Sequence, residues 1–376
     1  MATRAVSSPV ASPTVLITGA SGMLGRALHR LLLLESNYYN IIGLGFSRLE
    51  VNHYHQHFPP PSTTKHDCHK SKVCLHRINL LDYDETSSFL RQHNPDIIVH
   101  CAAERYPDAF EKNLDASFQL NVDATRNLAS ECLRLASENR EHARKRPYLI
   151  YISTSYVFDG GVSSHVYPPY KPGSKTNPIN SYGKSKWEGE CAVRDILNKV
   201  EGLGQGFIVR VPLLYGADCV DLNESPALEM MKVHLPQNQC DSNETRTIKK
   251  IDDWALRFPT SVEDVAKVLK QMIDRLLEES DDNAFRAGTY HVASPHGCTK
   301  YNLLHLQSNL LGISSDVVEK RAVGDSSGPP ATSAPRPQCT QLDCSDTWRA
   351  IGQDFKFVTL EEGMEKALCG FPERFM

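Results

Sequence analysis

The sequence contains no long hydrophobic run. Its longest apolar stretches, such as Leu31–Leu34 and Leu149–Ile152, are far shorter than the roughly 20 residues that a membrane-spanning helix needs. Met1–Pro13 lacks a charged segment followed by an apolar one, which is the pattern of a secretory signal. We therefore expect neither membrane insertion nor export.

An excess of charge of one sign and paired cysteines are lacking as well. The formal net charge is −4, so the composition does not favour nucleic acid or an anionic membrane as a partner. The 11 cysteines are scattered without the spacing of a zinc site or a disulfide framework. Free thiols in a long chain fit a reducing compartment, so we expect a cytoplasmic protein.

Residues 52–72 are rich in proline and histidine and lie between two expected strands. Five histidines and Cys68 suggest a metal site, but their neighbours are Pro, Ser, Thr and Lys, which provide no rigid frame for ligands. We therefore interpret 52–72, like the charged run 138–146, as a surface insertion, and we expect no metal site.

Apolar, β-branched runs alternate with helical patterns along the first part of the chain. The expected strands are Thr14–Thr18, Tyr39–Leu44, Cys74–Ile78, Ile97–Cys101, Tyr148–Ser153 and Phe207–Val211. The helical patterns lie at Met23–Leu34, Ala116–Leu135 and Ser185–Leu197. Apolar strands that alternate with helices indicate a parallel sheet buried on both faces. The predicted fold is therefore α/β, with a doubly wound parallel sheet and a smaller C-terminal α/β lobe.

A glycine-rich loop follows the first expected strand and opens the first helix. Gly19, Gly22 and Gly25 form a G-x-x-G-x-x-G pattern, with Met23 and Leu24 between the last two glycines. The first glycine permits a tight turn, the second lets a pyrophosphate approach the backbone, and the third lets the helix pack against the sheet. The helix N-terminus then offers N–H groups to the phosphates. This combination predicts a Rossmann-type dinucleotide site.

The end of the second strand indicates which dinucleotide binds. An acidic residue there contacts the ribose of NAD, but this chain has Ser47 and Arg48, which can bind a 2′-phosphate. These residues favour NADP(H). The alternative is that Arg48 is an ordinary surface arginine, and an acidic residue, Glu50, lies close to the end of the strand. Asp82 is placed to accept from the adenine amino group. The small Ala102-Ala103 pair leaves room for a cofactor beside the fourth strand.

Tyr182 and Lys186 form a Y-x-x-x-K pattern at the start of an expected helix. Residues four apart share a helical face, so the ammonium lies near the phenol and lowers its pKa. Tyr182 can then exchange a proton with a carbonyl oxygen. Thr154, at the end of the fifth strand, can hydrogen-bond the same oxygen. These three residues are the catalytic candidates.

The motifs together resemble the dTDP-4-dehydrorhamnose reductase branch of extended short-chain dehydrogenases/reductases, and the resemblance covers nearly the whole chain from Thr14 on. Within this branch, three stretches are similar to the regulatory beta subunits of methionine adenosyltransferase. They are HCAAERYPD (His100–Asp108), RFPTSVEDVA (Arg257–Ala266) and RPQCTQLDCS (Arg336–Ser345).

The resemblance assigns roles by position. It implies Thr154, Tyr182 and Lys186 as the family triad, and it adds Asn121, Arg210, Pro212 and Leu213 to the cofactor contacts named above. It also implies a division into a cofactor domain, 13–215, to which 257–293 returns, and a smaller substrate or partner lobe, 216–256 with 294–376. One departure is Ser155, where the family usually has Asp.

Two functions of different classes remain open from the sequence. The resemblance to the beta subunits implies a cytosolic, NADP-binding regulatory protein whose partner is the catalytic subunit that makes S-adenosylmethionine. The triad and the branch favour instead an NADPH-dependent reductase of a nucleotide-sugar 4-ketone. A reductase of an unrelated small carbonyl compound is a third possibility, because a fold does not fix a function.

Overall fold

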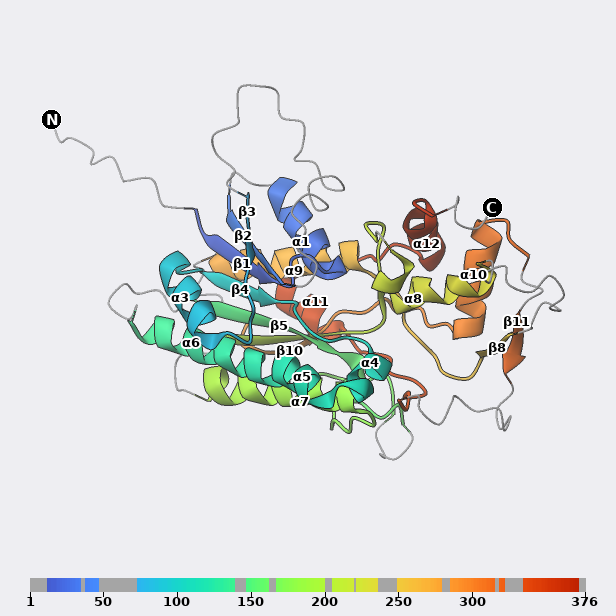
Figure 1. Cartoon of the computed structure of the whole chain (residues 1–376), viewed down its shortest axis with the longest axis horizontal. Helices are drawn as coiled ribbons and strands as arrows, with labels where there is room; N and C mark the ends of the chain where they lie inside the picture. Colours follow the sequence, from blue (N-terminus) through green and yellow to red (C-terminus); the bar gives the residue numbers. More distant parts are fainter. Residues whose placement is uncertain are drawn as a thin grey trace, which may run out of the picture.

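The structure is a computed structural model that describes eleven stretches of the chain (Figure 1). They are residues 12–34, 38–46, 73–138, 147–161, 167–199, 205–219, 221–235, 249–278, 285–314, 318–321 and 334–371. Ser47, Arg48 and the insertion 52–72 lie outside these residues, as does 138–146 apart from its first residue.

A seven-stranded parallel sheet forms the centre of the described chain. Its order is β10-β6-β5-β4-β1-β2-β3. The strands are β1 (Thr14–Thr18), β2 (Asn40–Gly45), β3 (Val73–Arg77), β4 (Ile97–His100), β5 (Tyr148–Thr154), β6 (Gly206–Val211) and β10 (Gly288–His291). All residues of β4 and β6 are buried, as expected for a sheet covered on both faces. The predicted fold class is confirmed, and the six predicted strands are found within one residue at each end.

Helices cover both faces of this sheet (Figure 1). On one face, α1 (Met23–Leu34), α9 (Val262–Leu277) and α11 (Ser345–Ile351) share a hydrophobic core with the sheet. On the other face, α3 (Tyr83–His93), α6 (Ala124–Glu138) and α7 (Ser181–Val193) do the same. Their apolar residues recur with helical spacing, so each helix buries one stripe of side chains.

The helix predicted at Ala116–Leu135 differs in detail from the observed one. Two short helices, α4 (Pro107–Lys112) and α5 (Leu114–Phe118), precede a π-helical segment at Gln119–Asp123, which continues into α6. A π segment widens the helix locally and is frequent at functional sites. Helix α7 also starts earlier than predicted, because the Asn180 side chain caps it by accepting from the Gly183 N–H. It continues beyond Val193 as a second π segment, Arg194–Asn198.

A smaller group of elements lies beyond the main sheet, at the right of Figure 1. It contains α8 (Pro226–Glu229), α10 (Lys300–Leu310), α12 (Leu360–Leu368) and the parallel pair β8 (Lys249–Asp252) and β11 (Val318–Arg321). A second short pair, β7 (Leu214–Tyr215) and β9 (Thr260–Ser261), leads from β6 towards α9. The chain thus leaves the main sheet after β6 and re-enters it through α9 and β10.

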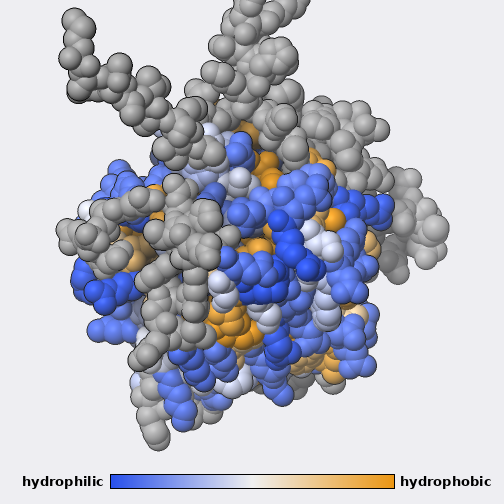
Figure 2. All heavy atoms as spheres, turned by 90° about the vertical axis from the view of Figure 1, so that its left-hand side faces the viewer, coloured by the Kyte–Doolittle hydropathy of each residue, from blue (hydrophilic) through white to orange (hydrophobic). Residues whose placement is uncertain are grey.

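The opposite side of the molecule, seen in Figure 2, is mainly hydrophilic. On this face the hydrophobic area of the described residues lies in separate patches between polar side chains. Scattered patches of this kind are ordinary on a protein surface and point to no ligand. The candidate site lies instead where the strands of the main sheet end.

Candidate functional site

The strand order reverses between β1 and β4, and the loops that follow these two strands touch each other. Gly19 has a φ of +65°, and a Cβ on it would lie 2.7 Å from the backbone nitrogen of Ala102. The Ala102 N–H also donates to the Thr18 hydroxyl at 3.3 Å. Ligands of open α/β sheets bind at such a switch point, outside the carboxyl ends of the strands. The structure therefore brings the glycine loop and Ala102-Ala103 together at the expected place.

The other two glycines of the loop have different surroundings. A Cβ on Gly25 would lie 2.2 Å from the Gly19 carbonyl oxygen, so only glycine lets α1 start this close to the loop. A Cβ on Gly22 would meet nothing within 4 Å except the same oxygen, at 3.2 Å. Gly22 is thus less crowded than Gly19 and Gly25, although a Cβ there would still make a tight contact with the backbone. Met23 and Leu24 are buried in the core.

Helix α7 approaches β5 closely because it carries two glycines on the facing side. A Cβ on Gly183 would lie 2.2 Å from the Tyr156 carbonyl oxygen, and one on Gly189 would lie 2.3 Å from the Tyr151 hydroxyl. This contact places Tyr182 beside Thr154, with which it forms a hydrogen bond. The structure therefore brings the three predicted catalytic residues to one edge of the sheet.

The Tyr182 hydroxyl is a weak acid in this structure, so the prediction that the Lys186 ammonium lowers its pKa is wrong. Burial raises its pKa to about 12, while the hydrogen bond with Thr154 and the charge of Arg105 act in the opposite direction. Its ring makes edge-to-face contacts with Phe110 and Tyr156. Tyr182 is thus held as a neutral phenol at neutral pH, the form that can donate a proton.

Lys186 is a buried cation, 3% exposed. Its Nζ lies 4.1 Å from the centre of the Tyr151 ring, a cation–π contact. Burial lowers the pKa of Lys186 to about 7, although Glu190 and Cys101 oppose this effect. Among the described residues, no side chain or backbone carbonyl accepts a hydrogen bond from the Lys186 ammonium. A buried ammonium of this kind is suited to an acceptor supplied by a ligand.

The charge of Lys186 also influences His100, at the end of β4. The two ring nitrogens of His100 contact the hydroxyls of Thr18, at 2.7 Å, and Thr125, at 3.0 Å. Burial, followed by the charge of Lys186, lowers the pKa of His100 to about 3. His100 therefore stays neutral and supports the ends of β1 and β4 without adding a second positive charge.

Four predicted cofactor residues have protein partners that the sequence did not indicate. Asp82 caps α3 by accepting from the Glu85 N–H. Asn121, in the π segment, bonds both backbone groups of Glu104 and the Ser185 hydroxyl, and so holds the loop after β4 against α7. Leu213 accepts from the Thr260 N–H through its carbonyl, and Pro212 precedes it as β6 ends.

Arg210 is the fourth of these residues, and its guanidinium faces α7. It forms a buried bidentate ion pair with Glu190, at 2.8 and 2.7 Å, and lies over the Phe158 ring. Its Nη1 donates to the Pro172 carbonyl at 3.1 Å. In the structure it therefore joins β6 to α7.

Sequence reasoning missed two connections near the site. Ser155 is buried, and its Oγ lies 3.1 Å from the Thr340 hydroxyl, so the RPQCTQLDCS segment packs directly beside Thr154. Arg26, one residue after the last glycine of the loop, forms a buried ion pair with Glu224. The sequence distance of 198 residues gave no signal for this pair.

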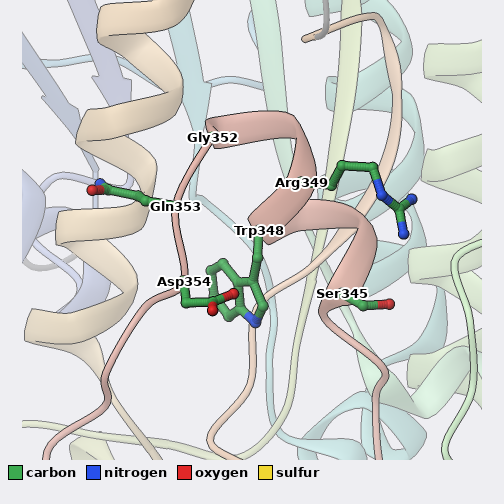
Figure 3. Close-up of a pocket in the computed structure, with 6 residues that line it drawn as sticks. All are labelled: Ser345, Trp348, Arg349, Gly352, Gln353 and Asp354. Atoms are coloured by element: carbon green, nitrogen blue, oxygen red, sulfur yellow. The ribbon is translucent and has the colours of Figure 1, made fainter.

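Two further observations limit where the site can be. The described residues hold no group of three or more His, Cys, Asp or Glu side chains arranged for a metal, and they form no helix with the length and apolarity to cross a bilayer. A surface hollow of about 390 Å³ lies at the end of α11, and its lining includes Trp348 and Asp354 (Figure 3). It belongs to a different element from Tyr182 and Lys186 and carries none of the site chemistry described above.

The sheet order, the glycine loop and the Tyr182–Lys186 pair define an extended short-chain dehydrogenase/reductase fold. The sequence matches the RmlD substrate binding domain family over residues 13–368. It is 35% identical to methionine adenosyltransferase 2 subunit beta of Bos taurus over 332 residues, which cover 88% of this chain and 80% of the relative. The chain therefore belongs to the RmlD substrate-binding family and, within it, to the methionine adenosyltransferase beta subunits.

Other relatives agree with this placement. The subunit of the same name from Mus musculus is 34% identical over 364 residues, covering 96% of this chain and 89% of that protein. The fold is similar to that of dTDP-4-dehydrorhamnose reductase from Bacillus anthracis, solved in complex with NADP, with a TM-score of 0.63 and 22% identity. That similarity covers 96% of this chain and 99% of the reductase.

Proposed function

We propose that this protein is a cytoplasmic, NADP(H)-binding regulatory subunit of methionine adenosyltransferase, which modulates S-adenosylmethionine synthesis by binding the catalytic subunit. The observation that carries the proposal is the extent of the sequence relationship, 34% identity over 96% of the chain to a protein named as that enzyme's beta subunit. Eight cysteines have free thiols in the structure, which agrees with a reducing compartment.

The residues at the switch point fit a nicotinamide dinucleotide. Gly22, which has no side chain, suits a pyrophosphate beside the α1 N-terminus, and the buried ammonium of Lys186 suits the hydroxyls of a ribose. Arg48 and Ser47 would select the 2′-phosphate of NADP(H). When bound, such a cofactor supplies hydride chemistry.

A reductase of a nucleotide-sugar ketone is the second candidate, because Tyr182 lies beside Thr154 and the buried Lys186 is on the same helix. Tyr182 holds a proton that Thr154 orients, and Lys186 supplies a positive charge from the same helix. These groups would protonate a carbonyl oxygen. The same residues would also serve a subunit that only binds the cofactor, so their presence does not separate the two functions.

The Tyr182→Phe variant distinguishes the two candidates. It removes the hydroxyl and keeps the ring that packs on Phe110. General acid catalysis contributes about a hundred- to ten-thousandfold to a rate, so a reductase should lose that factor in NADPH oxidation with a dTDP-4-keto-6-deoxy sugar. A regulatory subunit should still bind the catalytic subunit and change its kinetics as wild type does. Tyr156→Phe, which removes the hydroxyl of the neighbouring ring, is the matched control.

Sugar reduction that is lost only in Tyr182→Phe, together with no effect of any form on S-adenosylmethionine synthesis, would contradict the regulatory proposal. Co-purification with the catalytic subunit and an unchanged effect of Tyr182→Phe on its kinetics would support it.

A further inference from the structure

A buried ion pair joins the glycine loop to the chain that leads into the smaller lobe. Arg26 and Glu224 are 4% and 6% exposed, and two bonds of 2.9 and 2.6 Å connect the guanidinium with the carboxylate. The same guanidinium donates to the Ser21 carbonyl, inside the glycine loop, at 2.6 Å and to the Asp218 carbonyl at 2.9 Å. Arg26 thus holds the loop and the distant segment at the same time.

The backbone of Glu224 also contacts the loop that follows β4. Arg105 Nη2 donates to the Glu224 carbonyl at 3.0 Å. Arg105 lies next to Glu104, whose backbone Asn121 fixes against α7 through Ser185. Glu224 therefore connects with the glycine loop through its side chain and with the loop after β4 through its carbonyl.

Glu224 is connected to the smaller lobe through the residues that follow it, so a displacement of Glu224 would also move α8. The next residue, Ser225, caps α8 by accepting from the Ala227 N–H, and it donates to the Leu214 carbonyl at 2.8 Å. The Ala227 carbonyl accepts from Gln307 of α10 at 2.8 Å. Three buried hydrogen-bonded contacts therefore connect Arg26 with α10: Arg26 to Glu224, Ala227 to Ser225, and Gln307 to Ala227.

We propose that Glu224 is a positioning residue of the dinucleotide site. Through Arg26 it fixes the glycine loop in the conformation that receives a pyrophosphate, and a bound dinucleotide in return orders the chain from Glu224 into α8. The effect must be reciprocal, because coupling between two sites acts equally in both directions. The inference rests on the proposed dinucleotide binding, and it adds a route by which the cofactor reaches the smaller lobe.

Glu224→Gln tests the inference, since it keeps the shape of the side chain and removes the charge. We expect the Kd for NADPH to rise about tenfold, within the usual range of coupling between sites. The Kd for 2′-AMP, which has no pyrophosphate, should stay unchanged, whereas a general loss of structure would weaken both ligands. Arg30→Gln is the control, because it breaks the exposed Arg30–Asp218 pair between the same segments and should change neither Kd.

Hydrogen exchange on wild type provides a second measurement that does not depend on a variant folding. We expect NADPH to protect residues 221–229 as well as the glycine loop. Protection that stops at the glycine loop, or a Glu224→Gln variant with unchanged NADPH affinity, would overturn the inference and leave the proposed dinucleotide binding intact. A wild-type protein that does not bind NADPH would overturn both.

Discussion

Removal of the Lys186 ammonium is the most direct test of the candidate site. Burial lowers the pKa of this group from its ordinary value of 10.5 to about 7. An oxygen-rich, anionic ligand beside the ammonium favours the charged form and therefore raises the pKa again. Binding of NADPH should then be accompanied by the uptake of a proton at Lys186.

The sign and size of the pH dependence follow from this shift. Below about pH 7 the free protein already carries the proton, so the affinity is highest there. Above pH 7 the free protein loses the proton while the complex keeps it, so the affinity falls as the pH rises. Between the pKa of Lys186 in the free protein and its pKa in the complex, each pH unit weakens the free energy of NADPH binding by about 1.4 kcal/mol, or about tenfold in Kd. The Kd should therefore rise about tenfold per pH unit above pH 7, until the pH reaches the pKa of Lys186 in the complex.

The assay is a fluorescence titration of NADPH at several pH values in this window, where the 2′-phosphate stays ionised. Lys186→Met should bind NADPH weakly at every pH and without the pH dependence. Lys184→Met is the control, because Lys184 is exposed on the same helix. An affinity of wild type that stays constant across this range, or an equal slope in Lys186→Met, would refute the role assigned to Lys186.

Gly22→Val should abolish NADPH binding with an unchanged circular dichroism spectrum, because a Cβ there meets only the Gly19 carbonyl among the described atoms; retained binding would make Gly22 a simple turn residue. Arg48→Ala should weaken NADPH about ten- to hundredfold and leave NADH unchanged, and equal affinities of wild type for both cofactors would remove this argument. Glu190→Ala leaves the buried Arg210 without its carboxylate, so urea denaturation should show a loss of about 3–5 kcal/mol in the free energy of unfolding. A loss below about 1 kcal/mol would mean that the pair contributes little.

Local patterns in the sequence predicted the sheet and part of the site. The strands were predictable because burial on both faces makes them apolar throughout, and Gly19, Gly22 and Gly25 were predictable because their spacing serves one turn. Contacts between distant segments were not predictable. The Arg26–Glu224 pair joins residues with no shared pattern, and nothing in the sequence indicated that Arg210 would face Glu190.

The helix around Asn121 shows a second kind of limit. Its apolar periodicity predicted a continuous α-helix, but the structure has a π segment at Gln119–Asp123. A π segment widens one turn inside an otherwise continuous helix, and the apolar pattern of this stretch did not indicate where that turn lies. The expected cofactor contact of Asn121 remains a prediction, and its bonds to Glu104 and Ser185 came only from the structure.

The contact of α7 with β5 has a consequence for how substitutions in this chain are read. Gly183 and Gly189 bear no functional group, yet a Cβ at either position would clash with Tyr156 or Tyr151, so that the packing around Tyr182 and Lys186 would have to shift. A library of single substitutions, scored for cofactor binding, should therefore rank these two positions with the residues that touch the ligand. Such a library would distinguish residues that contact the ligand from glycines that permit close packing only if folding were measured as well as binding.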